Sequence, residues 1–85
     1  MKTIFIMVKC ELGKAYIVAD EAVQQVEQVS EVYSTSGQYE LLMKCYLAED
    51  ADIGRFVTEK LQTLAGVKDT FTIIAYKAFS EDRSY

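Results

Sequence analysis

Histidine is absent from this 85-residue chain. Without an imidazole, three kinds of chemistry are excluded: His-based acid–base catalysis, activation of a nucleophile by histidine, and histidine-containing zinc sites. Basic side chains are also scarce, since 9 lysines and arginines stand against 13 acidic residues and the net charge is −4. No basic run is available to neutralise phosphates, so we do not expect the chain itself to bind nucleic acid.

Long apolar segments are missing as well. The apolar run at residues 1–8 stops at Lys9, and further charges follow without the small-residue pair of a signal-peptide cleavage site. No stretch approaches the ~18 apolar residues that a membrane helix needs. We therefore expect a cytoplasmic protein, and the length and composition indicate one globular domain rather than two.

Only two cysteines occur, Cys10 and Cys45, each inside an apolar, strand-like run. Such cysteines usually act as small buried hydrophobic side chains. A disulfide between them would need adjacent strands, and a reducing cytoplasm disfavours it. Acidic clusters could in principle bind a metal, but helix surfaces and helix caps explain them better, so we expect no metal and no cofactor. The clusters are Asp20 with Glu21, and Glu49 with Asp50 and Asp52.

The pattern that is present alternates between the strand and helix periods. It predicts the order strand, helix, strand, strand, helix, strand over residues 3–10, 14–28, 29–36, 39–47, 53–64 and 71–79. Asp50 or Asp52 is the predicted cap of the second helix, and Gly66 its predicted left-handed stop. We assign residues 1–79 to the domain and residues 80–85 to a polar tail.

Two short similarities indicate that a strand–helix–strand unit is duplicated. Residues 29–33 (VSEVY) after the first helix resemble residues 67–71 (VKDTF) after the second. Met-Val-Lys-Cys before the first helix likewise resembles Met-Lys-Cys before the second. Two such units in tandem predict an α+β, ferredoxin-like split βαβ fold, a four-stranded antiparallel sheet with both helices on one face.

The other face of this sheet would carry apolar side chains into water. Residues Phe5, Met7, Leu42 and Tyr46 fall on it. An open sheet with this many large apolar groups exceeds what a soluble monomer usually exposes. We therefore predict that these four residues form the interface of a homodimer that pairs sheet to sheet.

Three stretches resemble the effector-binding (RAM) domain of the Lrp/AsnC family of transcriptional regulators. Gly37-Gln38-Tyr39-Glu40 and the apolar strand after it are similar to the family's Gly-x-Tyr-Asp turn and strand. A helix carrying Phe56, Val57 and Leu61 resembles the family's second helix, and residues 66–72 (GVKDTFT) resemble its Gly-Val-x-x-Thr-x-Thr signature. The resemblance covers nearly the whole chain, with Glu40 standing where the family usually has Asp.

The resemblance implies a stand-alone form of the domain, because the usual N-terminal helix-turn-helix has no counterpart here. It also implies a dimer that assembles further, such as a ring of dimers, and that associates with full-length regulators. Small effectors such as amino acids bind between dimers in the family. By position, the implied ligand-binding residues are Gly37, Tyr39 and Glu40, with Thr70 and Thr72 as neighbours.

Each of these residues also has a structural explanation. Gly37 is first of all a turn glycine, Tyr39 can pack on the sheet, and Glu40 can simply be solvated. The threonines suit a strand as well as they suit hydrogen bonding. Three functions therefore stay open: a non-enzymatic amino-acid-binding and oligomerisation module, a small dimeric ferredoxin-like enzyme of the monooxygenase or isomerase type, and a purely structural oligomerisation subunit.

Overall fold

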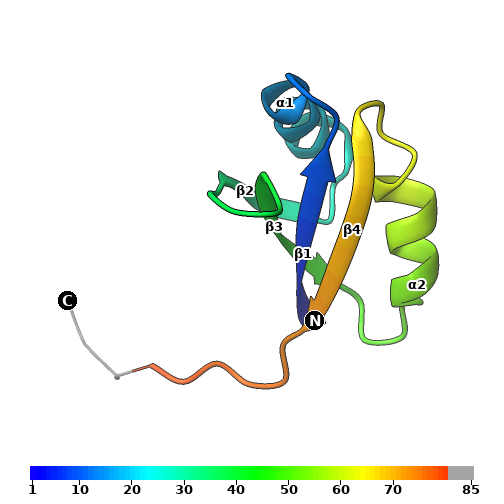
Figure 1. Cartoon of the computed structure of the whole chain (residues 1–85). Coiled ribbons are helices and arrows are strands. Elements are labelled where there is room, and N and C mark those ends of the chain that lie inside the picture. Colours follow the sequence, from blue (N-terminus) through cyan, green and yellow to red (C-terminus); the bar gives the residue numbers. More distant parts are fainter. Residues whose placement is uncertain (81–85) are drawn as a thin grey trace.

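The computed structural model describes residues 1–80 of the chain (Figure 1). Its elements are β1 (Lys2–Cys10), α1 (Ala15–Gln25), β2 (Val29–Ser34), β3 (Leu41–Leu47), α2 (Ile53–Phe56), the π-helical turn η1 (Val57–Leu61) and β4 (Val67–Ile74). The predicted element order is confirmed. Of the predicted tail at residues 80–85, only residue 80 lies inside the described part.

The strands form one antiparallel sheet in the order β2-β3-β1-β4. The two helical segments pack on one face of the sheet, as predicted for the ferredoxin-like plan. In each strand–helix–strand unit, the helix connects two strands that are separated in the sheet by a strand of the other unit. The two units therefore interleave, and their first strands, β1 and β3, become the central pair. The sheet edges are then β2 and β4.

Alternation of burial along the central strands defines the two faces. Every second residue of β1 and of β3 is buried, while the residues between them are half-buried. The buried set faces the helices and forms a continuous core with their apolar stripes. The core residues are Ile4, Ile6, Val8, Cys10, Val18, Ala22, Val26, Val29, Leu41, Met43, Cys45, Leu47, Phe56, Val57 and Leu61.

Helix α1 is shorter than predicted. The periodicity predicted residues 14–28, but the helix ends at Gln25, and Val26 is already extended with φ −108° and ψ 102°. Val26 and Val29 are both buried, at 5% and 6% exposure. A β-branched residue has a low helix propensity, so ending the helix before Val26 costs little free energy. The turn at 26–28 lets both valines enter the core.

The second helix begins at one of the two predicted cap residues, Asp50 and Asp52. Asp52 Oδ1 accepts a hydrogen bond from the Arg55 N–H at 3.0 Å, so Asp52 rather than Asp50 is the cap. Beyond Phe56 the helix widens, and the Gln62 N–H donates to the Val57 carbonyl five residues back, at 2.8 Å. Gly66 has the predicted left-handed backbone, with φ +96°, but it does not end the helix: the helical segment ends at Leu61, three residues short of the predicted 64, and Gly66 directly precedes β4.

Strand boundaries differ from the prediction by one residue in β1 and by more in the other three strands. The last strand was predicted at residues 71–79, but β4 runs from Val67 to Ile74 because its ladder is set by β1. The Ala75 N–H bonds to the Thr3 carbonyl at 3.2 Å, and β1 starts at Lys2, so the following residues have no strand to pair with. Likewise β2 ends at Ser34 and β3 begins at Leu41, which leaves residues 35–40 to form the connecting turn.

Both cysteines are buried and free. They lie on adjacent strands, but the register pairs Cys45 with Ile4, far along the strand from Cys10. Burial raises the pKa of the Cys45 thiol to about 11. The pKa of Cys10 is raised by burial and, secondarily, by the charge of Glu40. The prediction that these cysteines act as buried hydrophobic side chains is confirmed.

Candidate functional site

The turn between β2 and β3 carries the first predicted site residue. Gly37 has φ +105°, a conformation that L side chains rarely adopt, and open space surrounds the position where a Cβ would stand. Two bonds close the turn below it: the Thr35 N–H donates to the Glu40 carbonyl at 2.9 Å, and the Thr35 hydroxyl donates to the Tyr39 carbonyl at 2.8 Å. Gly37 thus presents its backbone to solvent at the tip of a closed turn.

Glu40 joins this turn to the end of β1. Its Oε1 accepts the Cys10 N–H at 2.6 Å, and its own N–H donates to the Val8 carbonyl at 3.0 Å. The β1–β4 register shifts between Lys9 and Cys10, and such a bulge leaves a backbone N–H in need of a partner. The carboxylate supplies that partner through one oxygen, so Glu40 is not merely a solvated side chain.

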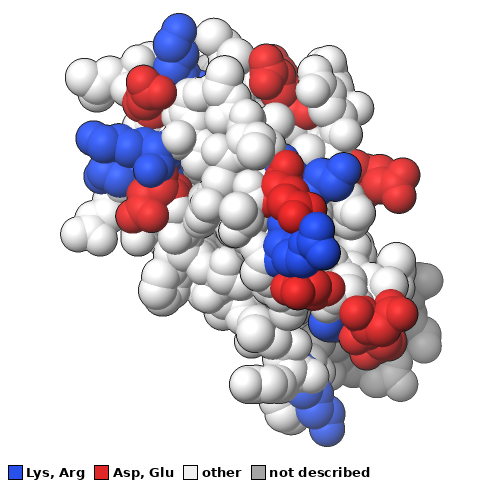
Figure 2. All heavy atoms as spheres, turned by 90° about the vertical axis from the view of Figure 1, so that its right-hand side faces the viewer, with Lys and Arg blue, Asp and Glu red and all other residues white. Residues whose placement is uncertain are grey.

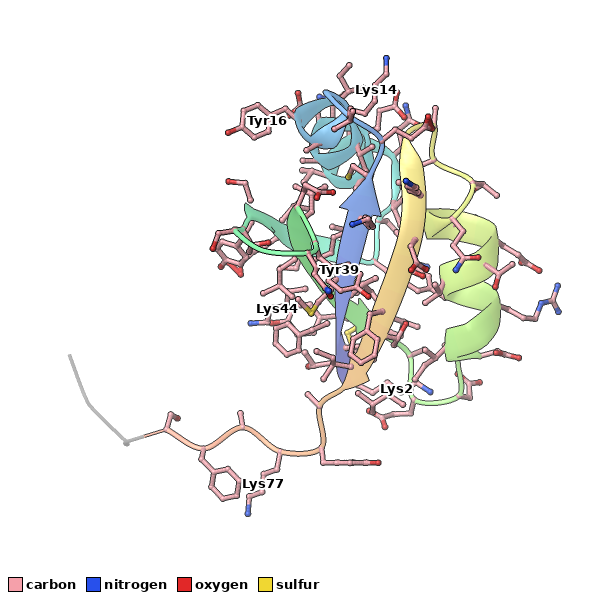
Figure 3. The ribbon with its side chains drawn as sticks, in the orientation of Figure 1. Lys2, Lys14, Tyr16, Tyr39, Lys44 and Lys77 are labelled. Carbon is pink, nitrogen blue, oxygen red and sulfur yellow. The ribbon has the colours of Figure 1, made fainter. Side chains whose placement is uncertain are left out.

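Tyr39 lies across the open side of the sheet. Its ring is 6.3 Å from that of Phe71 on β4, at an angle of 37°, which is a tilted aromatic contact. Lys9 donates from Nζ to the Gln38 carbonyl at 3.2 Å. The turn, the end of β1 and the start of β4 therefore meet at one end of the sheet, where Figure 3 shows the side chain of Tyr39 near β1 and β4.

A depression of about 920 Å³ opens beside Glu40 at this end of the sheet. Its lining consists of Lys9, Cys10, Glu11, Leu12, Lys14, Glu40, Val67 and Lys68. Three ammonium groups and two carboxylates thus lie around a concave surface that also holds the apolar Leu12 and Val67. Groups of both signs in one depression can pair with the two ends of a zwitterion.

The two predicted threonines lie elsewhere in the protomer. Thr70 pairs with Val8 and Thr72 with Ile6, residues whose side chains are in the core, so both threonines share the helix-facing side of the sheet. The Thr70 hydroxyl accepts a hydrogen bond from Gln62 Nε2 at 2.9 Å. Of the five predicted ligand-binding residues, only Glu40 lines the depression. Gly37 and Tyr39 lie in the adjoining turn, and the two threonines lie on the helix-facing side of the sheet.

The lysines around the depression were not among the predicted site residues. Lys9 ends the apolar run of β1, and Lys68 is the second residue of β4. In antiparallel neighbours the end of one strand lies beside the start of the next, and Lys9 is indeed paired with Asp69. Charged residues at strand ends were the signal that could have found them.

The predicted interface residues all lie on the face away from the helices, which we call the open face. Phe5, Met7, Leu42 and Tyr46 are each half-buried there. Strand register links Tyr33 to Leu42, Leu42 to Met7, and Met7 to Phe71, so one apolar row crosses all four strands. Its two ends are open to water, at 50% exposure for Tyr33 and 53% for Phe71.

Two residues of opposite charge, Lys44 and Glu31, interrupt the apolar surface of the open face. Lys44 lies beside Glu31 in the register, and its Nζ is 5.3 Å from the centre of the Tyr46 ring. Tyr33 donates its hydroxyl proton to Glu31 Oε2 at 2.7 Å, and this bond raises the pKa of Tyr33. Figure 3 shows Lys44 on the side of β1 away from α2. The lysine therefore has an acid and a ring close by on its own chain.

Charges of both signs alternate over the surface around α2 (Figure 2). An example is the ion pair between Arg55 and Glu59, 2.9 Å apart. This face offers no broad basic patch of the kind that binds nucleic acid. Within residues 1–80, no group of three or more potential ligands is arranged around a metal position, and no helix there is long and apolar enough to cross a membrane.

Comparison with known proteins agrees with this architecture. Residues 3–85 match the family model of the Lrp/AsnC ligand binding domain. The HTH-type transcriptional regulator FL11 of Pyrococcus abyssi is 31% identical over 77 residues, which is 91% of this chain and 50% of FL11. The crystal structure of TTHA0845 from Thermus thermophilus has 30% identity and a TM-score of 0.82, covering 95% of this chain and 100% of that one.

A further solved structure is the transcriptional regulator NMB0573 of Neisseria meningitidis in complex with L-Met. It is 20% identical with a TM-score of 0.78, covering 94% of this chain and 53% of that one, and so shows the likeness of fold alone. This chain spans about half, or less, of the length of the curated relatives that it matches. Those relatives are HTH-type transcriptional regulators. With its fold, turn motif and matched length in agreement, the chain belongs to the Lrp/AsnC ligand-binding domain family.

Proposed function

We propose that the protein is a cytoplasmic, non-enzymatic sensor domain that binds a free amino acid at the end of the sheet where the 35–40 turn meets β1 and β4. The observation that carries this proposal is the depression beside Glu40, whose rim combines that carboxylate with Lys9 and Lys68. An amino acid presents an ammonium and a carboxylate a few ångströms apart. A rim of both signs fits such a ligand better than it fits a purely anionic or apolar one.

Each end of the ligand has a candidate partner. The free oxygen of the Glu40 carboxylate pairs with the ligand ammonium, while its Oε1 stays on the Cys10 N–H. The ligand carboxylate is received by the backbone N–H groups around Gly37 and by the nearby lysine ammonium groups. Tyr39, whose ring contacts Phe71, lies outside the depression in the adjoining turn and would meet the ligand side chain where it extends toward that turn. The L-Met complex of NMB0573 supports a ligand of this class.

Thr70 and Thr72 enter the proposal only through a second copy. The sheet separates them from Glu40 within one protomer, so a ligand held at the turn could contact them only on a neighbouring subunit. This agrees with an assembly in which dimers pair through their open faces and then associate further, with ligands between dimers. Ligand binding to this assembly would be signalled to full-length regulators of the same family. The similarity to FL11 supports such a partner.

The amino-acid proposal is tested by thermal unfolding of the purified protein with each of the twenty amino acids at millimolar concentration. A ligand present at ~100 times its Kd stabilises by about 2.7 kcal/mol, which raises Tm by several degrees for a small domain. We expect a selective rise for one amino acid or a few related ones. A flat response across the whole panel would contradict amino-acid sensing and favour a structural subunit.

Glu40→Gln tests the assigned ammonium contact. The amide oxygen can still accept the Cys10 N–H, so the turn should keep its geometry, but the negative charge is lost. We expect about 10-fold to 100-fold weaker amino-acid binding by calorimetry, since a hydrogen bond to a charged group contributes about 1.5–3 kcal/mol. The oligomeric state should not change. Glu11→Gln, at the same depression but without the bond to β1, serves as the matched control; if both variants bind alike, Glu40 is not the ammonium partner.

A further inference from the structure

The chain continues past β4 as an extended arm, residues 75–80. After the bond from the Ala75 N–H to Thr3, no backbone bond in the described chain ties the arm to the sheet. Two of its aromatic side chains are almost fully in water, at 95% exposure for Tyr76 and 85% for Phe79. Lys77 Nζ lies 5.1 Å from the centre of the Phe79 ring, a contact that leaves the rest of that ring uncovered.

The arm leaves the sheet on its open-face side. It lines a groove of about 620 Å³ together with residues of the open face. The open-face residues in this lining are Thr3, Phe5, Lys44 and Tyr46. Figure 1 shows the arm running from the C-terminal end of β4 away from α2, and Figure 3 shows Lys77 far from both helices. A second copy seated on the open face would meet the arm directly.

The arm would enlarge the interface of an open-face dimer. Four strands with seven paired residues along the centre give the sheet a flat footprint of about 19 by 24 Å at the usual strand spacing and rise. A stable interface of standard size buries about 800 Å² of accessible surface on each partner. Aromatic side chains bury about 150–250 Å² each. Tyr76 and Phe79 together would therefore add a large share of the area that such an interface needs.

We propose that the arm is exchanged between the two copies of the dimer, with Tyr76 and Phe79 packed on the margin of the partner's open face. This inference rests on the open-face dimer proposed above. In a two-fold dimer each copy gives one arm and receives one, so the two aromatic pairs are buried at both ends of the interface. The arm explains why two large aromatic rings follow a strand that has no further partner strand.

A single-tryptophan reporter tests the exchange, because the chain contains no tryptophan. Phe79→Trp should show blue-shifted emission and protection from acrylamide quenching at concentrations where the protein is dimeric. Both effects should disappear when Leu42→Asp is added to split the dimer. Tyr16→Trp is the control, since Tyr16 is 74% exposed on α1 at the opposite end of the molecule (Figure 3), and its emission should stay that of an exposed indole in both backgrounds.

The second measurement uses a variant that lacks both aromatic rings of the arm. Tyr76→Ser combined with Phe79→Ser should weaken the dimer about tenfold or more in sedimentation velocity, with an unchanged fold by circular dichroism because neither ring is in the core. A native protein that is monomeric at all concentrations would overturn the open-face dimer and the arm together. A dimer whose Kd is unaffected by the double variant, with the indole of the Phe79→Trp reporter exposed, would overturn the arm alone.

Discussion

Leu42→Asp is expected to convert the proposed open-face dimer into a folded monomer. Leu42 lies at the centre of the apolar row on the open face, between Tyr33 and Met7. In a two-fold dimer the change occurs twice, and each copy loses about 1.5–3 kcal/mol of apolar burial and adds a carboxylate that must be desolvated. The dimer Kd should rise at least about 1,000-fold, which corresponds to about 4 kcal/mol.

Sedimentation velocity or light scattering over a dilution series measures this effect. Leu42 is only half-buried within its own protomer, so the variant should keep its circular dichroism spectrum. Leu12→Asp is the matched control, because it makes the same chemical change at a side chain that is 100% exposed and remote from the open face. If the Leu42→Asp protein remains dimeric, the open face is not the interface.

Gly66→Ala is expected to be the most destabilising small substitution in the chain. Gly66 has φ +96°, and an added Cβ would lie 3.0 Å from the Lys14 Cβ and 3.0 Å from the Val18 Cγ2. Val18 is fully buried, so it cannot move without disturbing the core. Backbone strain of about 1–3 kcal/mol and overpacking of about 1–3 kcal/mol therefore act together.

Chemical denaturation followed by circular dichroism would measure the loss, expected at about 2–6 kcal/mol in the free energy of unfolding. Gly37→Ala separates the two causes, because Gly37 has a similar φ of +105° with nothing within 4 Å of the added Cβ. That variant should show the strain alone. Equal losses at the two positions would mean that the contact with α1 contributes nothing.

Much of the fold followed from local patterns. The period of apolar residues in residues 3–10 and 39–47 predicted the two central strands and the faces on which their side chains lie. Helix ends were less accurate, because the end of α1 depends on where Val26 and Val29 find room in the core. The limits of β4 were also missed, since a strand ends where its neighbour ends, and that neighbour is β1, far earlier in the sequence.

The candidate site, like the fold, was predicted from the sequence only in part. The turn motif identified Gly37, Tyr39 and Glu40 as a local cluster, because three residues within one turn cannot lie far apart. Tertiary structure decided the rest: it tied Glu40 to the bulge at Cys10, brought Lys9 and Lys68 to the same depression, and turned Thr70 and Thr72 to the other face. Sequence determines which side chains alternate along each strand, whereas only the pairing of strands determines which of them meet across the sheet.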